Sequence, residues 1–593
     1  MRRIASAAAL LAALWAGAPA RAAAPLQLSG PTPFARGCAT TGSPTFNSSA
    51  EPSIAVDPRD ARHIVVAWQQ DRFNSDGGAN SNVIGVSRDG GRSFREVTVA
   101  GLSRCTGGTD ERASDPWVTI GPDGAVYLAS LTFSEMPQNQ VIAGPTELAV
   151  SRSDDGGLTW GAPVYVAPFD ETYNDREQLV ADPNHPGVVY FAWVKRYAVE
   201  GESGIEMFSR SVDGGRTWSP ASVAYAPPPG MLTDPTLLVV TPDGTLVNLI
   251  MIANLSPFLP SAVPRIAWTV IAQRSTDMGQ SWSHTSTIAS VDPFPPIEPA
   301  SGKIVRAYPL ISTDVGPDGT VYVAWNDIPT PTGGSRVLIS KSADGALSWS
   351  PPAVVASSTG QVFLPSVAVD RSGAVGVTYD DTRNSTAGHL TTDVWLSRSN
   401  DGGAHWAESH VSGPFETLTA SESDSAGVQG LFLGDYQGLA GLGSGFAAAF
   451  AQARPVATHG PSDMYFAALT GSGATAPATG GSVTLTVSPA RVVAGRRARF
   501  VFWARVVSPE GGAAVGPLAR ARILFEGRRL LTDAHGRASV VLTPHRVGLR
   551  RALVLAPGFG AARAYVRVVG RARHRGRADG LRRQRAVLQL QTR

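Results

Sequence analysis

Cysteine is nearly absent from this sequence: its 593 residues contain only Cys38 and Cys105. Two cysteines cannot supply the four ligands of a cysteine-rich structural zinc site, so that class of fold is excluded. Beyond the N-terminus, no stretch reaches about 18 uninterrupted apolar residues, so we expect no membrane span. His-Glu-x-x-His, Gly-x-Ser-x-Gly and a phosphate-binding loop are missing too. The sequence therefore lacks the best-known signatures of metalloproteases, serine hydrolases and nucleotide-binding proteins, which disfavours these three functions.

The first 22 residues have the form of a secretory signal peptide. Arg2 and Arg3 precede a short apolar run, and Ala20-Arg21-Ala22 offers small residues at a cleavage site. We therefore expect a secreted protein, either extracellular or periplasmic. Paired cysteines in exported proteins most often form disulfides, so we predict a Cys38–Cys105 bridge, with two free thiols as the alternative.

Charge is divided unevenly along the chain. From residue 478 to the end there are 23 Arg, no Lys and 4 acidic residues, a balance of +19, whereas the preceding residues carry −16. A small, polar stretch with Gly and Pro separates the two parts, as expected at a domain boundary. The predicted organisation is a signal peptide (1–22), an N-terminal latch (23–50), a main domain (51–470), a linker (471–481), a second domain (482–569) and a basic tail (570–593).

One short segment occurs six times in the main domain. The copy at 209–218 reads SRSVDGGRTW, and the others keep most of the pattern Ser-x-Asp-x-Gly-x-Thr-Trp. The aspartates of the six copies are Asp89, Asp155, Asp213, Asp277, Asp344 and Asp401. They recur at intervals of 57 to 67 residues, which indicates a repeated supersecondary unit.

Each repeat has the pattern of four short strands. In one repeat these are 310–316, 320–328, 335–342 and 352–358, which are rich in Val, Ile, Tyr and Trp and separated by turn residues. Four strands per unit of about sixty residues indicate a propeller blade. A further unit of the main domain lacks the repeated segment and a fourth strand. An N-terminal strand near 25–30 could supply that fourth strand. We predict an all-β fold, a seven-bladed β-propeller, with six blades as the alternative.

The repeated segment has the chemistry of a rigid turn. Its aspartate can accept hydrogen bonds from main-chain amides of its own turn, and its glycine can adopt the positive φ that such a turn needs. The tryptophan opens the next strand and can pack between sheets. We therefore predict a structural role for the segment, and expect any active or binding site elsewhere.

This segment is the Asp-box, and over about residues 51–470 the chain resembles the sialidase-like, BNR-repeat propellers. The resemblance implies that the boxes lie on the face opposite the functional site. It also implies that a sialidase would need three arginines to bind a carboxylate, a tyrosine nucleophile with a glutamate partner, and an aspartate as the acid/base. The candidates for the arginine clamp are Arg176, Arg306 and Arg383. Tyr308 is the candidate nucleophile, Glu177 its partner and Asp115 the acid, and Asp381 lies at the same strand exit as Arg383.

The Arg-Ile-Pro signature implied by the resemblance is missing from the first blade. We therefore predict a carbohydrate- or protein-binding module of undefined ligand. The alternative is an exo-sialidase or related glycoside hydrolase acting on sialylated or other acidic glycans, and a lyase is a third reading. We expect a cell-surface glycan as partner, no nucleic acid, no cofactor and a monomer, and leave a structural Ca²⁺ open.

The second domain has alternating strands at intervals of about ten to fourteen residues, which favours a small Ig-like sandwich. The segment 525–542 resembles bacterial Ig-like modules, whose implied role is that of a spacer or adhesion unit. The tail at 571–593 holds eight Arg and should be disordered. A solvated tail and electrostatic attachment to an anionic polymer or surface are its two interpretations.

Overall fold

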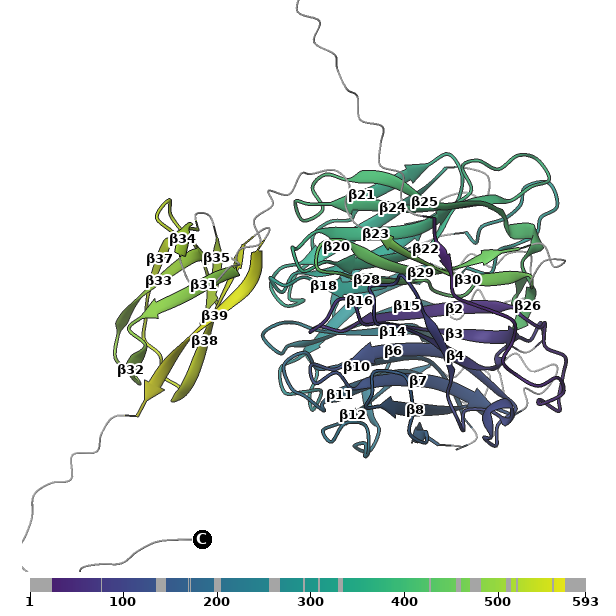
Figure 1. Ribbon diagram of the computed structural model, residues 1–593, viewed down its shortest axis with the longest axis horizontal. Helices are drawn as coiled ribbons and strands as arrows, with labels where there is room; N and C mark the ends of the chain where they lie inside the picture. Colours follow the sequence, from purple (N-terminus) through teal and green to yellow (C-terminus); the bar gives the residue numbers. More distant parts are fainter. Residues whose placement is uncertain are drawn as a thin grey trace, which may run out of the picture. The chain divides into compact units, whose positions relative to one another are not determined.

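The computed structural model consists of two compact units, Met1–Thr475 and Ala476–Arg593 (Figure 1). It describes residues 24–75, 77–134, 145–168, 170, 172–196, 204–254, 267–291, 294–307, 310–328, 334–425, 428–454, 460–469, 482–507, 514–518, 521–556 and 559–570. The predicted signal peptide, linker and all but one residue of the predicted basic tail lie outside this range. Across the described residues the fold is all-β apart from two single-turn 3₁₀ helices, and no helix among them is long and apolar enough to cross a membrane.

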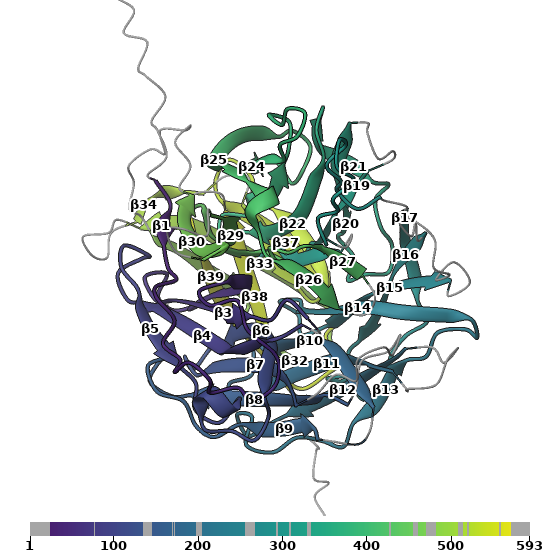
Figure 2. The ribbon, with the colours of Figure 1, turned by 90° about the vertical axis from the view of Figure 1, so that its right-hand side faces the viewer.

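The first unit is built from antiparallel sheets whose strands follow one another in the chain (Figure 2). One sheet holds β2 (Ser49–Val56), β3 (Ile64–Arg72), β4 (Ala79–Ser87), β5 (Arg95–Thr98), β6 (Arg112–Ile120), β7 (Val126–Phe133), β8 (Glu147–Ser153) and β9 (Val164–Ala167). Its two halves, β2–β5 and β6–β9, meet through the single pair Ala79 and Ala113.

Four further sheets hold four consecutive strands each. They comprise β10 (Tyr173–Ala181), β11 (Val189–Arg196), β12 (Ile205–Ser211) and β13 (Ser222–Tyr225); β14 (Met231–Val240), β15 (Leu246–Asn254), β16 (Trp268–Ser275) and β17 (Ser286–Val291); β18 (Ser312–Val315), β19 (Val321–Asp327), β20 (Ser335–Ser342) and β21 (Ala353–Ser358); and β22 (Val362–Val369), β23 (Val375–Asp381), β24 (Thr391–Ser399) and β25 (Ala407–Glu416).

The last sheet of the first unit combines both ends of that unit. It contains β28 (Gly438–Gly441), β29 (Phe446–Ala453), β30 (Ser462–Leu469) and the N-terminal β1 (Leu26–Gln27), and in the antiparallel pair of β1 and β30 Leu26 lies opposite Phe466. A two-stranded hairpin, β26 (Glu422–Ser425) and β27 (Val428–Leu431), comes between β25 and β28 in the chain. It lies near the centre of the ring of sheets (Figure 2).

The sheets form a closed ring. The first strand of each four-strand set contacts the first strand of the next, in the order β2, β6, β10, β14, β18, β22, β28 and back to β2. This cyclic packing is that of a β-propeller, and the ring is closed by the sheet that combines β1 with β28, β29 and β30, from the two ends of the first unit.

The predicted Cys38–Cys105 disulfide is confirmed, with the two Cα atoms 4.8 Å apart. It joins the N-terminal segment to the 3₁₀ helix η1 (Arg104–Thr106). A second 3₁₀ helix, η2 (Thr417–Thr419), follows β25.

The cores between neighbouring sheets are formed largely by the second strands. Trp68, Trp193 and Trp325 occupy the same place in the sequences of β3, β11 and β19, and each is at most 1% exposed. Both faces of a propeller sheet pack against neighbours, so these strands are apolar on both sides. This explains why the second strands have nearly continuous apolar sequences.

The repeated segments form turns with a constant hydrogen-bond pattern. At 211–218, Asp213 Oδ1 accepts from the main-chain amides of Arg216 and Thr217 at 3.1 and 2.9 Å, while Oδ2 accepts from the Thr217 hydroxyl at 2.6 Å. Ser211 Oγ donates to the same aspartate and accepts from the Gly215 amide. In the other five turns the aspartate likewise binds the amide four residues ahead and the serine two residues before it.

A basic side chain links several of these turns to the next one around the ring. It comes just before the turn's serine, or just after it in the first copy, and donates to a main-chain carbonyl of the next turn. The pairs are Arg88 with Asp155, Arg152 with Gly214, Arg210 with Met278 and Lys341 with Gly402, at 2.5 to 2.8 Å. The turns therefore stabilise both their own sheet and the contact between sheets.

The second unit contains two sheets. One comprises β31 (Ser482–Ser488), β33 (Ala498–Val507), β34 (Ala514–Pro517) and β37 (Arg537–Leu542), and the other comprises β32 (Arg491–Val493), β35 (Arg522–Phe525), β36 (Arg528–Leu531), β38 (Gly548–Ala556) and β39 (Phe559–Val569). A core that includes Phe500, Phe502 and Phe525 is formed by residues of both sheets.

Candidate functional site

The first strands of five of the four-strand sets carry a β-bulge near their N-terminal ends. The register shifts fall at Glu51-Pro52 in β2, Asp115-Pro116 in β6, Arg176-Glu177 in β10, Asp234-Pro235 in β14 and Leu364-Pro365 in β22. Four of these residues have positive φ: Glu51 at 55°, Asp115 at 44°, Arg176 at 58° and Leu364 at 50°. A bulge changes the direction of a side chain, and a non-glycine residue in this region is strained, so the bulges bring charged groups into the ring at an energetic cost.

The bulges lie on the face opposite the box turns. The turn that follows the C-terminal end of β2 contacts a box turn, because the His63 imidazole lies 2.9 Å from the Gly156 carbonyl oxygen. The box turns therefore lie at the C-terminal ends of the first strands, and the bulges lie at their N-terminal ends. Two different faces of the ring thus carry the structural turns and the charged bulges.

The bulges contribute to a cluster of charged side chains, defined here as Glu51, Asp115, Asp175, Glu177, Asp234, Asp435, Arg72, Arg176, Arg196 and Arg306. Arg176 binds two other members, Asp234 at 2.9 Å and Asp435 at 2.7 Å. Arg196 also pairs with Asp234, and Arg306 lies 3.4 Å from Asp435. Although burial opposes it, the nearby arginines lower the pKa of Asp435. Asp435 is therefore the ionised partner of two guanidinium groups.

The hairpin β26–β27 and the segment after it support two arginines of the cluster. Arg72 and Arg306 both donate to Ser423 Oγ at 3.2 Å, and both guanidinium groups lie over the Phe432 ring, at 3.9 and 4.8 Å from its centroid. Burial lowers the pKa of Arg72 to about 10. Both arginines are thus held by contacts inside the protein.

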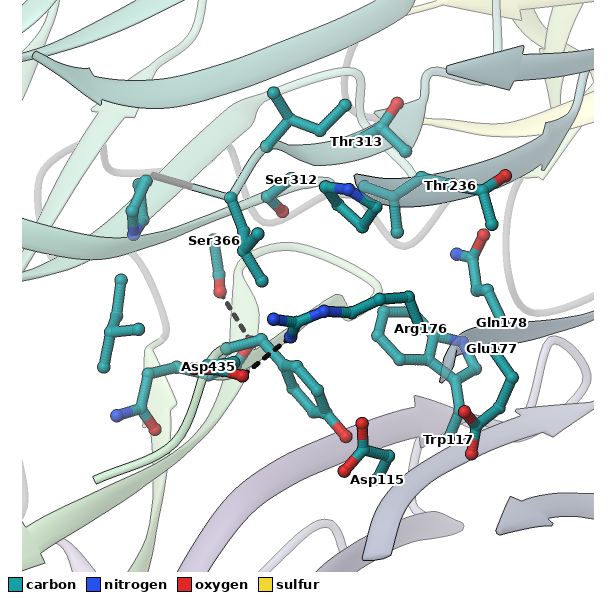
Figure 3. A pocket seen from close by; sticks show the side chains of 18 residues that line it. Asp115, Trp117, Arg176, Glu177, Gln178, Thr236, Ser312, Thr313, Ser366 and Asp435 are labelled. Atoms are coloured by element: carbon teal, nitrogen blue, oxygen red, sulfur yellow. Dashed lines mark hydrogen bonds and ion pairs between the residues drawn. The ribbon is translucent and has the colours of Figure 1, made fainter. Parts of the chain in front are cut away.

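A cavity of about 80 Å³ adjoins the cluster (Figure 3). Charged and aromatic residues from three chain segments line one side of it: Asp115, Trp117, Arg176, Glu177, Asp435 and Tyr436. The Trp117 and Tyr436 rings form an edge-to-face pair with centroids 5.5 Å apart, and the Tyr436 hydroxyl donates to the Pro116 carbonyl at 3.1 Å. Residues of β14, β18 and β22, together with Gln178, Leu310, Ile311 and Gln437, complete the lining.

Glu177 is the unusual member of this lining. It is 4% exposed, and neither of its carboxyl oxygens has a hydrogen-bond partner in another residue. Burial, followed by the negative charge of Asp115, raises the pKa of Glu177 well above its ordinary value. An unpartnered buried carboxylate is very unfavourable, so the surroundings of Glu177 favour its protonated form.

The cluster contains six carboxyl groups and four guanidinium groups. Besides Glu177, Glu51 also has a pKa raised well above its ordinary value by burial, and burial raises the pKa of Asp175 to about 6.

The predicted site residues separate into two groups. Asp115, Arg176 and Glu177 line the cavity, and Arg306 belongs to the same cluster. Arg383 does not join them. Its guanidinium binds Asp381 and Glu408 at 2.6 and 2.7 Å and lies over the Trp395 ring, so the structure does not support the predicted clamp of Arg176, Arg306 and Arg383. Tyr308 lies outside the described residues.

Several residues of the site were not among the predicted catalytic candidates, namely Glu51, Arg72, Asp435 and Tyr436. A second repeat in the sequence points to part of this set, because an acidic or apolar residue followed by proline opens the segments EPSIAV, DPWVTI, DPTLLV and LPSVAV. These dipeptides coincide with bulges. Arg72 and Asp435 are not part of such a dipeptide, and each contacts residues far away in the chain, Ser423 for Arg72 and Arg306 for Asp435.

Among the described residues, no group of three or more His, Cys, Asp or Glu side chains has an arrangement that could hold a metal ion.

Comparison with known proteins gives no match to a family model and no match among curated proteins. Solved structures give remote matches. A Hadza microbial sialidase, Hz136, is 14% identical over 70% of this chain and 75% of its own, with a TM-score of 0.40. An α-L-arabinanase of Penicillium chrysogenum is 10% identical over 76% and 98%, with a TM-score of 0.39. A PL25 ulvan lyase is 11% identical over 72% and 96%, with a TM-score of 0.40.

Proposed function

We propose that this protein is a secreted carbohydrate-binding propeller whose site is the cavity beside Glu177. The first unit is assigned as a seven-bladed, sialidase-like propeller with Asp-boxes, because β2–β5 and β6–β9 count as two blades joined by one pair of residues. The second unit is assigned as an Ig-like sandwich that acts as a spacer, and the protein as a monomer.

One observation carries the functional proposal: an unpartnered, buried carboxyl group lies in the same cavity wall as an aromatic pair. Sugars present hydroxyl groups that donate to carboxyl oxygens and C–H faces that pack on aromatic rings. Binding sites combine a largely apolar wall with a few directed polar groups, and Trp117 and Glu177 provide both. The position of the cavity among the charged bulges, opposite the structural turns, supports the same assignment.

The test is calorimetric titration of the full mature chain with neutral, acidic and basic oligosaccharides. We expect saturable binding to at least one class, weakened several-fold by Trp117→Phe and by Asp115→Asn. Val212→Ala, at an exposed position in a box turn, is the matched control and should bind as the parent chain does. Absence of binding across the panel, or equal affinity in all variants, would refute the proposal.

A second candidate function is glycoside hydrolysis, which the pairing of Glu177 with Asp115 favours. Glycosidases use a protonated carboxylic acid beside a second, ionised carboxylate, and burial keeps Glu177 protonated. The test is hydrolysis of a panel of fluorogenic glycosides that includes sialosides. Here Glu177→Gln would abolish turnover while substrate still binds. The ion pairs of Arg176 and Arg306 with Asp435 weigh against an exo-sialidase, because a substrate carboxylate would have to displace that aspartate.

A further inference from the structure

The unpartnered polar atoms of the cavity lining include both carboxyl oxygens of Glu177, together with Asp435 Oδ1 and Gln437 Nε2. Arg176, the arginine of the lining, is held by Asp234 and Asp435. Glu177, in contrast, is nine-tenths buried and has two oxygens without hydrogen-bond partners in other residues. Figure 3 shows its carboxyl group turned toward that of Asp115, on the side of the cavity where Trp117 lies. An anionic ligand would meet only occupied guanidinium groups there, together with two carboxyl groups.

We propose that the ligand bears an ammonium group, as a glycan with free amino sugars does, and that this group binds between the carboxyl groups of Glu177 and Asp115, against the rings of Trp117 and Tyr436. This inference rests on the proposed function and specifies its substrate class.

The chemistry of the wall suits a cation better than it suits a neutral hydroxyl group. Ammonium groups are attracted to the faces of tryptophan and tyrosine rings, more strongly when both partners are desolvated. Charge-assisted hydrogen bonds to carboxylates are about twice as strong as neutral ones. At about 80 Å³ the cavity has room for an amino-bearing substituent of a sugar ring.

Binding of a cation must change the protonation of Glu177. The groups that act on its carboxyl group are Asp115 on β6, Asp175 on β10 and Glu51 on β2, all of which favour the protonated form in the free protein. Burial raises the pKa of the nearby Tyr436, and Glu177 is one of the carboxyl groups that add to this shift. An ammonium group supplies the missing positive charge, so Glu177 gives its proton to solvent and forms an ion pair. Ligand binding therefore releases about one proton per site.

The experiment is calorimetric titration of the mature protein at pH 6 with a fully deacetylated β-1,4-glucosamine tetramer, repeated in two buffers of different ionisation enthalpy. Cellotetraose is the matched probe, because it has a hydroxyl in place of each amino group. We expect the glucosamine tetramer to bind at least about 10-fold more tightly than cellotetraose, with release of about one proton.

Two variants locate the effect. Glu177→Gln should remove both the proton release and the preference for the amino sugar. Glu206→Gln is the matched control, because Glu206 is also a buried glutamate with a raised pKa but lies outside the cavity lining, bound by Thr236 and Asn248. It should bind as the parent chain does.

The outcomes separate this inference from the proposed function. Equal or tighter binding of cellotetraose, or amino-sugar binding without proton release, would refute the ammonium site while leaving carbohydrate binding intact. Binding of neither probe, nor of any glycan in the wider panel, would refute both. The proton count is measured on the parent protein, so the test holds even if Glu177→Gln fails to fold.

Discussion

The guanidinium group of Arg152 donates a hydrogen bond to the main-chain carbonyl of Gly214 at 2.8 Å, and thereby joins one sheet of the ring to the box turn of the next. It also lies over the Tyr127 ring, with the guanidinium carbon 5.4 Å from the centroid. Three other basic residues make the corresponding bond between neighbouring turns. The repeated sequence therefore stabilises the contacts between sheets as well as its own turns.

Replacing Arg152 with Met should lower the free energy of unfolding by about 1–3 kcal/mol, because the variant loses a charge-assisted hydrogen bond to a main-chain carbonyl. Urea denaturation of the mature chain measures this. Arg92→Met is the control, because Arg92 is exposed and lies within a box turn. Equal losses in the two variants would contradict a role for Arg152 between sheets.

Two neighbouring aspartates allow a matched test of the box turn. Asp155 accepts hydrogen bonds from the amides of Leu158 and Thr159 and from the Thr159 hydroxyl, whereas Asp154 makes an exposed ion pair with Arg152. Asp155→Ala should destabilise the protein by about 1–2 kcal/mol, because it leaves turn amides unsatisfied. Asp154→Ala should cost less than about 1 kcal/mol. Thermal unfolding of the two variants side by side checks the difference, and the reverse order would contradict the structural assignment.

Adjacent glycines in the first box turn differ in what surrounds them. Gly90 and Gly91 have φ of 79° and 83°, so alanine is strained at either position by about 1 kcal/mol. A Cβ at Gly90 would have no atom within 4 Å, whereas at Gly91 it would lie 2.1 Å from the Phe466 ring in the sheet that closes the propeller. Gly91→Ala should therefore be the more destabilising by several kcal/mol. Comparable stabilities of the two alanine variants would contradict this packing.

Glu206 should make stability depend on pH. Burial raises the pKa of Glu206 to about 8 from an ordinary value of 4.5. Between these values the folded protein keeps a proton that the unfolded chain has lost, so stability should fall as pH rises through this window and level off above it. Glu206→Gln should flatten the decline. Denaturation curves at pH 5 and pH 8 test this, and an unchanged slope in the variant would count against it.

The Cys38–Cys105 disulfide closes a loop of 67 residues that includes the first strands of the ring. A loop of this length corresponds to a loss of about 4 kcal/mol of stability on removal of the bond, through the entropy of the unfolded chain. The double variant Cys38→Ser, Cys105→Ser should therefore unfold at lower denaturant concentration. The parent chain under reducing conditions should behave in the same way. A stability indifferent to both treatments would show that β1 needs no covalent support.

The sequence predicted the repeated architecture well because its determinants are local. The alternation of apolar residues, the turn residues and the Ser-x-Asp-x-Gly pattern all act within about ten residues, so they can be recognised without tertiary structure. The closing strand near residues 25–30 and the disulfide were also predicted, since an incomplete last unit and two cysteines leave few alternatives.

The site was predicted only in part. Asp115, Arg176 and Glu177 were chosen by residue type and position after a turn, and the structure brings them to one cavity. Arg383 met the same criteria but pairs with Glu408 across its own sheet. Residue type alone could not distinguish Arg176 from Arg383, because the two differ only in which side chains of the folded protein neutralise their charge.

The amino-acid sequence by itself determined that strands would form, where they would turn, and that the turns would repeat around a ring. The tertiary structure alone decided which charged groups are paired, and it left Glu177 buried without a partner in another residue. The reason is physical: turn and strand preferences depend on near neighbours in the chain, whereas desolvation and ion pairing depend on groups such as Arg176 and Asp435, which are 259 residues apart and meet only when the ring closes.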